Sequence, residues 1–468
     1  MNAIVKHATD LHPLARIVGQ ESPRRTPSGV IPCVIGRDLQ LIPDILGRYC
    51  FKEISSRAED LIIIAGVIAF ADRAVARKMS ISWLRQLDVT IPVLEPNFWR
   101  QTHVVDALRS LLNLLTGDAW TLHFSSKSQR LDVQAQPPLN FITNEQPIVM
   151  PYSDGMDSFA VGRLLASDNP GVPLLMVTAG SRLDADKQRR ESQLDGRRLR
   201  LAVPFRISQE HGVRLREPSY RTRALIYGVM GAIAAQLSGA NRIMVSESGQ
   251  GALGPWLVPV GNEALDIRMH PAYTSQLTQF VNSALGIQVA YEHPRLWSTK
   301  GQTLRELAER NLAEDWHETR SCARDARHMS YGRTRLQCGV CAACLLRRMS
   351  IRSAGLEESL DNYMWKNLSA SSLDDAVVDP TRVASKADRG HAICGALAMA
   401  QLSELTKPEQ SAYVDGKAQE LAYIRGEHVD FVRKQLAGLI QQHANEWDEF
   451  VAHQGDSSYL APFSGDMR

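Results

Sequence analysis

The segment Ser153–Ser158 (Ser-Asp-Gly-Met-Asp-Ser) is the part of this sequence best suited to holding a phosphate group. It follows a short apolar run, Pro147–Pro151, which predicts a strand, and it precedes Phe159–Ala166, which predicts a helix. A loop between a strand and a helix binds anions with its backbone N–H groups and with the positive end of the helix. The spacing therefore predicts an anion site at this loop.

The side chains of the loop add specific chemistry. Ser153 and Ser158 have hydroxyl groups that donate to phosphate oxygens, and Gly155 allows a ligand to approach the backbone closely. Asp157 is suited to hold Mg²⁺ or to orient the loop amides. The chain has no Walker pattern, so a nucleotide would bind without the usual lysine of that loop. An ordinary polar turn is the alternative. The candidate cofactor-binding residues are Ser153, Asp154, Gly155, Met156, Asp157 and Ser158.

A cysteine cluster lies further along the chain. Cys338, Cys341 and Cys344 form a Cys-x2-Cys-x2-Cys run, and Cys322 lies 16 residues before it. Four thiolates complete a tetrahedral zinc shell without an open position, which is typical of a structural site. Gly339 suits the turn between the first two ligands. Four unliganded cysteines and an iron–sulfur cluster are the alternatives, although the proline that follows the fourth ligand in bacterial ferredoxin runs is absent.

Three regions are predicted to position these residues. Residues 1–145 mix strand and helix signals and predict an α+β region of unknown role. Residues 146–355 alternate strands with helices, which predicts an α/β fold with a doubly wound parallel sheet. Residues 356–468 have a polar, helical pattern, as in Leu402–Leu405 and Phe431–Phe450. Such parallel sheets bind ligands beyond the carboxyl ends of their strands, where the Ser153–Ser158 loop is expected.

Individual elements follow from apolar periodicity. In the first region, the sequence predicts strands at Leu61–Phe70, Val89–Leu94 and Trp120–Phe124 and a helix at Trp99–Leu115. In the second region, it predicts strands at Pro173–Thr178, Val203–Ile207, Arg242–Ser246 and Ile287–Tyr291, and helices at Arg223–Leu237 and Ala272–Leu285. A polar, arginine-rich helix is expected between the first two of these four strands.

Basic residues gather between 182 and 223, where 12 lysines and arginines outnumber six acidic residues. The local net charge of +6 is suited to neutralising a triphosphate. Arg221 and Arg223 are the preferred candidates because they lie at the start of a predicted helix, and Lys300 is a further one. A solvated surface cation is the alternative for each. For His270, the alternative to a functional role is that it is an ordinary residue at the start of a helix.

The loop resembles the Ser-Gly-Gly-x-Asp-Ser motif of PP-loop ATP pyrophosphatases, with Asp154 in place of a glycine. Together with the cysteine cluster it resembles one branch of that superfamily, the 7-cyano-7-deazaguanine synthase (QueC) family, whose zinc motif matches Cys322, Cys338, Gly339, Cys341, Cys344 and Arg347. Weaker similarities include Ser219–Arg223, Glu247–Gly249, His270-Pro271 and Thr299-Lys300. The resemblance covers about 147–350. The longer layout is similar to QueC-like proteins of bacterial antiphage defence clusters (QatC type).

The resemblance implies an ATP-dependent carbon–nitrogen ligase with ATP, Mg²⁺ and Zn²⁺ as cofactors. In the family reaction, the carboxylate of 7-carboxy-7-deazaguanine attacks the α-phosphate of ATP, and ammonia then displaces AMP. The implied catalytic residues are Asp157, Arg223 and Lys300, and Arg221 joins the cofactor-binding loop. The implied metal ligands are Cys322, Cys338, Cys341 and Cys344. Because the regions flanking residues 147–350 are absent from compact synthases, an amine on a partner protein is a second candidate acceptor.

The overall composition narrows the class of protein. The formal charge of +2 gives no indication of a nucleic-acid or membrane partner. No export signal is visible, so we expect a cytoplasmic chain with reduced cysteines.

Two other functions remain open. One is a tRNA-modifying PP-loop enzyme, which the basic stretch and the cysteines favour. The other is a non-catalytic nucleotide-binding module, which Asp154 favours.

Overall fold

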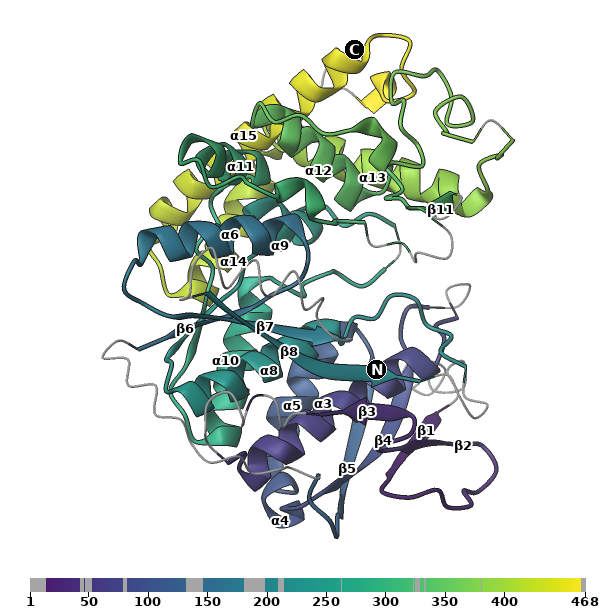
Figure 1. The fold of residues 1–468 in the computed structure, drawn as a ribbon, viewed down its shortest axis with the longest axis vertical. Helices are drawn as coiled ribbons and strands as arrows, with labels where there is room; N and C mark the ends of the chain where they lie inside the picture. Colours follow the sequence, from purple (N-terminus) through teal and green to yellow (C-terminus); the bar gives the residue numbers. More distant parts are fainter. Residues whose placement is uncertain are drawn as a thin grey trace. The chain divides into compact units, whose positions relative to one another are not determined.

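The computed structural model describes residues 14–42, 46, 53–78, 82–131, 146–180, 198–208, 214–261, 263–322, 324, 329–331, 334–379 and 381–463. The chain forms two compact units, each built from several segments (Figure 1). Unit 1 comprises Met1–Ser153, Ala166–Val245 and Ala264–Glu292. Unit 2 comprises Asp154–Leu165, Ser246–Glu263 and His293–Arg468. These units group the chain differently from the three consecutive regions expected from the sequence.

A four-stranded sheet in unit 1 has the order β2-β1-β4-β5. Its strands are β1 (Ala15–Gln20), β2 (Val30–Val34), β4 (Gln86–Val93) and β5 (Ala119–Ser126). Every pair in this sheet is parallel. The N-terminal region is therefore α/β in character, and the expected α+β arrangement is wrong there. Parallel neighbours need crossover connections, and α3 and α5, described below, supply helices beside these strands.

A six-stranded sheet in unit 1 has the order β10-β9-β6-β7-β8-β3. The strands are β3 (Leu39–Leu41), β6 (Ile148–Pro151), β7 (Leu174–Gly180), β8 (Arg198–Ile207), β9 (Arg242–Met244) and β10 (Ala290–Glu292). Five of them are parallel, and β3, from the N-terminal region, pairs antiparallel with β8 at one edge. The central strand β6 is the one that leads into the Ser153–Ser158 loop.

Helices pack beside both sheets of unit 1 (Figure 1). They are α3 (Ser56–Ala74), α4 (Pro96–Trp99), α5 (Thr102–Thr116), α8 (Arg223–Ser238) and α10 (Pro271–Leu285). Helix α8 lies against β6, β7 and β9, while α3 contacts both β4 and α8. The N-terminal sheet and the six-stranded sheet thus share one packed body.

The predicted strand at Leu61–Phe70 is wrong, because this run lies in the middle of α3. Nearly every residue of the helix is buried, including its polar ones, since it packs against β3 and β4 and also against α8 and α10. A helix that is covered on all sides has no polar stripe, so its sequence looks like that of a buried strand.

Four charged side chains are buried where α3 ends. Arg85 Nη2 lies 2.6 Å from both Asp72 Oδ1 and Asp118 Oδ2, and Arg77 Nη2 lies 2.7 Å from Asp118 Oδ2. Burial alone would raise the pKa of Asp72, but Arg85 and other donors outweigh it and hold that pKa below its ordinary value. The network ties the end of α3 to the loops around β4 and β5.

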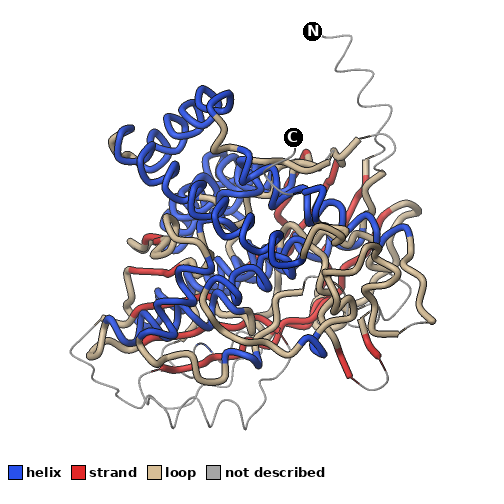
Figure 2. The backbone as a smooth tube through the Cα atoms, turned by 90° about the horizontal axis from the view of Figure 1, so that it is seen from above, coloured by secondary structure: helices blue, strands red, loops and turns tan. Residues whose placement is uncertain are grey.

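Unit 2 is mainly helical. Its helices are α6 (Met156–Asp168), α9 (Gly249–Leu257), α11 (Lys300–Glu309), α12 (Ala342–Ser353), α13 (Lys386–Glu404), α14 (Ser411–Arg425) and α15 (Val429–Gln454). Short 3-10 helices lie at Trp316–Glu318, Leu360–Asn362, Pro408–Gln410 and Ala461–Phe463, and a small hairpin joins β11 (Ser330–Tyr331) to β12 (Thr334–Arg335). Figure 2 distinguishes the helices and strands by type.

Most of the other predicted elements are confirmed. Strands occur at the expected places in β4 to β10, and helices at those of α5, α6, α8 and α10. The C-terminal segment is helical, as α13, α14 and α15 demonstrate. The arginine-rich helix expected after β7 falls on residues 181–197, which lie outside the described residues. Among the helices that the structure describes, none has the length and apolar character needed to cross a membrane.

Candidate functional site

The Ser153–Ser158 loop connects β6 to α6, as the sequence predicts. Helix α6 begins at Met156, so Asp157 and Ser158 lie in its first turn. The Ser158 hydroxyl donates to the Gly155 carbonyl (3.0 Å), and the Asp154 carbonyl accepts from the Arg320 amide (2.9 Å) while the Asp154 side chain is exposed. The loop thus has fixed backbone geometry and directs a helix N-terminus toward any bound anion.

Asp157 forms an ion pair with Lys300 inside unit 2. The Asp157 Oδ2 atom lies 2.7 Å from Lys300 Nζ, and the Lys300 side chain is only 6% exposed. Burial opposes the charge on Lys300, but the carboxylates of Asp157 and Glu247 outweigh it and raise the pKa of Lys300 above its ordinary value. Lys300 is therefore a buried cation at neutral pH. Two of the three residues expected to be catalytic, Asp157 and Lys300, are in direct contact.

Lys300 is the first residue of α11, where the helix dipole disfavours a positive charge. Thr299 caps this helix, and it forms a capping box with Gln302 that fixes the first turn. The Thr299 hydroxyl also donates to Glu446 Oε1 (2.6 Å) on α15. The fold therefore holds a cation at a helix end where the helix dipole opposes it.

Glu247 is held close to the Lys300 cation. A Cβ atom on Gly251 would lie 2.0 Å from Glu247 Oε1, so only glycine leaves room for this carboxylate against α9. Helix α9 begins at Gly249 with Ser248 as its N-cap, and the buried Ser248 hydroxyl has no hydrogen-bond partner in the described part of the chain. The Glu247–Gly249 segment was noted from sequence, but its approach to Lys300 comes from the structure.

A buried hydrogen-bond chain connects Lys300 to the C-terminal helices. The Lys300 backbone amide donates to Gln250 Oε1 (2.8 Å), and Gln250 Nε2 lies 2.8 Å from His443 Nδ1. His443 Nε2 lies 2.8 Å from the Met399 carbonyl, so the neutral ring donates from Nε2 and accepts at Nδ1. Sequence reasoning missed Gln250, His443 and Glu446, because nothing in their local pattern shows contacts across more than 100 residues.

The charge state of His443 makes stability depend on pH. Burial lowers the pKa of His443 to about 4, whereas an unfolded chain has a histidine pKa of about 6.5. The unfolded state therefore takes up the proton first, and the His443 contribution to stability is lost as pH falls from about 6.5 to about 4. We expect the free energy of unfolding to fall by about 2 kcal/mol from this group between pH 7 and pH 5.

Urea denaturation at these two pH values measures this effect. His443→Gln should show a smaller pH dependence than the parent protein, because glutamine does not titrate. The matched control is His453→Gln, which removes an exposed histidine of the same helix and should leave the dependence unchanged. Equal pH dependence in the parent protein and His443→Gln would contradict the assignment.

The two candidate arginines have different environments within unit 1. Arg221 is buried: it pairs with Asp266 (3.3 Å), donates to the Ala264 carbonyl (3.0 Å) and stacks on Trp83. Its guanidinium is thus committed to protein partners, and its part in cofactor binding stays a prediction. Arg223 is exposed at the first position of α8. His270 caps α10 by accepting from the Ala272 amide (3.1 Å), which confirms its place at a helix start.

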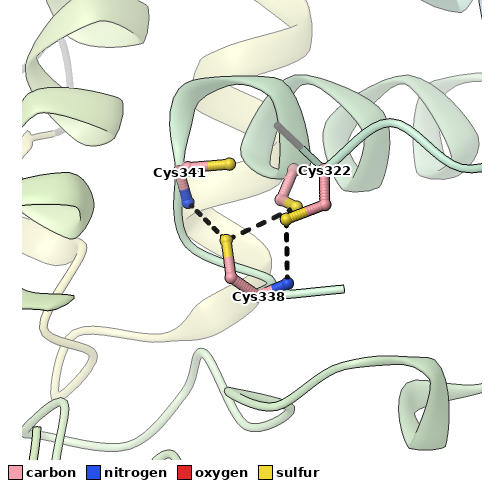
Figure 3. Close-up of side chains that lie close together, drawn as sticks. Cys322, Cys338 and Cys341 are labelled. Carbon is pink, nitrogen blue, oxygen red and sulfur yellow. Dashed lines mark hydrogen bonds between the residues drawn. The ribbon is translucent and has the colours of Figure 1, made fainter. Parts of the chain in front are cut away.

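The four cysteines predicted as metal ligands come together in unit 2. The Sγ atoms of Cys322, Cys338, Cys341 and Cys344 all lie within 4.8 Å of one another, and the last three of these residues are buried. Figure 3 shows the sulfurs of Cys322, Cys338 and Cys341 facing a common centre. A tetrahedral Zn–S shell with bonds of about 2.3 Å requires sulfurs about 3.8 Å apart, and Cys338 Sγ lies 3.6 Å from Cys344 Sγ.

Backbone groups around the cluster are arranged to support thiolates. The Cys338 amide lies 3.3 Å from Cys322 Sγ, and the Cys341 amide lies 3.3 Å from Cys338 Sγ. Gly339 has φ +88°, and a Cβ there would lie 2.5 Å from the Trp365 carbonyl, so the turn requires glycine. The donor set and spacing fit a zinc ion in a closed structural site.

Arg347 connects Cys322 with the run of the other three cysteines. It lies on α12 with Cys344 and donates to the carbonyl (2.9 Å) and hydroxyl (2.8 Å) of Thr319, three residues before Cys322. The buried Glu358 balances its charge at 2.6 Å. Cys322 is thereby brought to the run despite the long gap in sequence.

The cysteine cluster belongs to the hydrophobic core of unit 2. Its buried neighbours include Trp365, Met399, Trp447 and Phe450, which come from the C-terminal segment. Helix α13 packs closely on the turn, since a Cβ on Gly395 would lie 2.7 Å from the Val340 carbonyl. The helical C-terminal segment and the metal site therefore depend on each other for packing.

No protein-family model and no curated protein sequence matches this chain. The structure defines a mixed α/β protein with parallel sheets and a four-cysteine cluster suited to zinc.

Proposed function

We propose that this chain is an ATP-dependent ligase of the PP-loop type that activates a carboxylate by adenylation. The observation that carries the proposal is the ion pair between the partly buried Asp157 and the buried Lys300 at the start of α6 and α11, next to Glu247. A buried charge of this kind costs free energy, and a bound polyphosphate with its metal ion would account for its presence.

The order of strands supports a nucleotide site. The five parallel strands lie in the sheet in the order β8, β7, β6, β9 and β10. When they are numbered in chain order from β6, this is the order 3-2-1-4-5 of a doubly wound sheet. Ligands of such sheets bind at the switch point, which here falls between the carboxyl ends of β6 and β9.

Three helix N-termini come together in unit 2. Asp157 of α6 contacts Lys300 of α11, and Gln250 of α9 accepts from the Lys300 amide. The Gly249 amide of α9 also donates to the Ser298 carbonyl (3.0 Å) just before α11. Together with the Lys300 cation, these helix ends favour a polyanion. The Ser248 hydroxyl, which has no hydrogen-bond partner among the described residues, is a donor that a phosphate would satisfy.

Carboxylates at the same place fit a magnesium ion. Mg²⁺ in nucleotide sites takes one or two protein carboxylates and completes its shell with water and phosphate oxygens. Asp157 and Glu247 would hold it, and Mg²⁺ supplies charge neutralisation on the phosphates. Lys300 would hold phosphate oxygens in place and stabilise the charge that develops on the leaving pyrophosphate.

The reaction that we propose has two steps. A carboxylate oxygen of the substrate attacks the α-phosphorus of ATP, the bond between the α-phosphorus and the bridging oxygen breaks, and pyrophosphate leaves. An amine nitrogen then attacks the acyl carbon, loses a proton, and AMP leaves. By its resemblance to the QueC family, the chain would use 7-carboxy-7-deazaguanine, with ammonia or an amine on a partner protein as acceptor. A role in bacterial antiphage defence rests on the same resemblance.

Pyrophosphate release tests the proposal. The protein is incubated with ATP, Mg²⁺ and 7-carboxy-7-deazaguanine, and pyrophosphate is measured with and without ammonium. We expect release that requires the carboxylate, and Asp157→Ala should abolish it. Pyrophosphate release no higher than background would contradict the adenylation proposal.

A nucleotide-binding module without catalysis is the second candidate function. The exposed Asp154 carboxylate favours this function, since it adds negative charge to the loop beside the proposed pyrophosphate position. Tight ATP binding without pyrophosphate release, with candidate acceptors present, would support this function. A tRNA-modifying enzyme remains a proposal as well, and metal analysis that finds iron with sulfide would favour it over the closed zinc shell.

A further inference from the structure

Helix α15 turns one buried face toward the helix starts of the candidate site. Leu439, His443 and Glu446 form this face, and their spacing of i, i+4 and i+7 places them on the same side of the helix. Helices α9, α11 and α15 all belong to unit 2 (Figure 1). The face lies beyond residues 147–350, so the family resemblance gives it no role.

The start of α9 is held by the first two residues of this face. Leu439 packs on Gly249, the first residue of α9, where a Cβ would lie 2.6 Å from Leu439 Cδ2. One turn further along α15, His443 Nδ1 lies 2.8 Å from Gln250 Nε2. The other end of the same amide, Gln250 Oε1, accepts from the Lys300 backbone (2.8 Å). Gln250 therefore connects α15 to the backbone of Lys300.

The start of α11 is held directly by Glu446. Its Oε1 atom accepts from the Thr299 hydroxyl (2.6 Å), and a Cβ on Gly301 would lie 2.6 Å from the same oxygen. The Thr299 oxygen in turn accepts from the Gln302 amide (3.0 Å). Because the hydroxyl proton points to Glu446, a lone pair is left for the cap of the helix. Glu446 thus contacts the residues on both sides of Lys300.

The burial of Glu446 needs an explanation beyond packing. The residue is only 3% exposed, and burial raises the pKa of its carboxyl above the ordinary value. A buried carboxyl group costs free energy that an apolar side chain of similar size would avoid. Its contact with Thr299 accounts for a hydrogen-bond acceptor at this position.

We propose that α15 positions Lys300 for its ligand and that Glu446 is the positioning residue. This inference rests on the proposed function, in which Lys300 holds phosphate oxygens and stabilises the leaving pyrophosphate. Lys300 reaches Asp157 from the first position of α11, so a shift of that turn moves Nζ relative to the Ser153–Ser158 loop. A displacement of about 1 Å at a catalytic group can cost about 100-fold in rate. Glu446 acts through Lys300 and not on the substrate.

Steady-state pyrophosphate release by the full chain tests the positioning role. Glu446→Ala removes the acceptor and should lower kcat roughly 10- to 100-fold, while the KM for ATP changes less than about three-fold. Glu446→Gln keeps an acceptor oxygen and should hold kcat within about three-fold of the parent value. The matched control is Glu449→Ala, which removes an exposed carboxylate of α15 and should keep the parent kcat.

Amide hydrogen exchange of the segment 298–304 tests the same contact without a substrate. Exchange should be about ten-fold faster in Glu446→Ala than in the parent protein, because the first turn of α11 opens more often. Glu446→Gln and Glu449→Ala should exchange like the parent protein. A parent protein that releases no pyrophosphate contradicts the proposed function, whereas faster exchange in Glu446→Ala still supports the hold of α15 on α11.

Three results would overturn the inference. The first is a parent-like kcat in Glu446→Ala, and the second is unchanged exchange of the segment 298–304 in that variant. The third is an equal loss of kcat in Glu446→Ala and Glu446→Gln, since an acceptor oxygen would then not be what matters. If Glu446→Ala does not fold, Glu446→Asp takes its place, because its shorter side chain withdraws the carboxylate from Thr299 and should cause the same losses.

Discussion

Cys341→Ser is expected to remove the metal and to destabilise the protein in one step. The parent protein should contain about one zinc ion per chain, and the variant close to none. Structural zinc is held with about 10–16 kcal/mol in small domains, so we expect the free energy of unfolding to fall by on the order of 5 kcal/mol. The reason is that the cluster lies inside the core of unit 2, with Trp365 and Trp447 packed around it.

Metal analysis and thermal unfolding measure the two effects together. The matched control is Cys394→Ser, which replaces an exposed cysteine of α13 and should leave both zinc content and melting temperature as in the parent protein. Unchanged metal content and melting temperature in Cys341→Ser would refute a structural role for the cluster.

The second large effect is expected from Asp157→Asn. Pyrophosphate release should fall roughly 100-fold or more, because the variant lacks a carboxylate for Mg²⁺ and leaves Lys300 without its closest partner. Steady-state release at saturating ATP measures the loss. Asp168→Asn, at an exposed position in the last turn of the same helix, is the matched control and should keep the parent rate.

Leaving one charge of a buried pair without its partner also costs stability, about 3–5 kcal/mol. The double variant Asp157→Asn/Lys300→Gln removes both charges and should regain part of this stability while staying inactive. A single Asp157→Asn variant that releases pyrophosphate within a few-fold of the parent rate would show that this pair does not serve the reaction.

Features that depend on short-range pattern were predictable. The spacing of Cys338, Cys341 and Cys344 indicates a metal site, because ligands separated by two intervening residues on a turn can meet at one point. The loop at Ser153–Ser158 was predictable for a similar reason, since a strand, a glycine and a helix start follow one another directly.

Features that depend on long-range packing were not predictable. The run Leu61–Phe70 gives no sign of being a helix, because α3 is covered on every side. Strand β3 joins the six-stranded sheet beside β8, although more than 150 residues separate them. Local sequence does not determine such pairings, which depend on how the whole unit packs.

The environments of charged groups could likewise not be predicted from the sequence. Arg221 and Arg223 are two residues apart at the start of one helix, yet the first is buried against Asp266 and the second is exposed in a pocket wall. Their neighbours come from elements distant in sequence. The same holds for the link from Lys300 through Gln250 to His443, which joins three helices.

The identity of the phosphorus products tests the central claim most directly. Phosphorus NMR is used to follow a reaction that contains the protein, ATP, Mg²⁺, 7-carboxy-7-deazaguanine and ammonium. Ammonium supplies the amine nitrogen. The account predicts AMP and pyrophosphate in equal amounts, formed only when the carboxylate is present. Formation of ADP and inorganic phosphate, or ATP that stays intact in the presence of carboxylate and amine, would contradict adenylation by this chain.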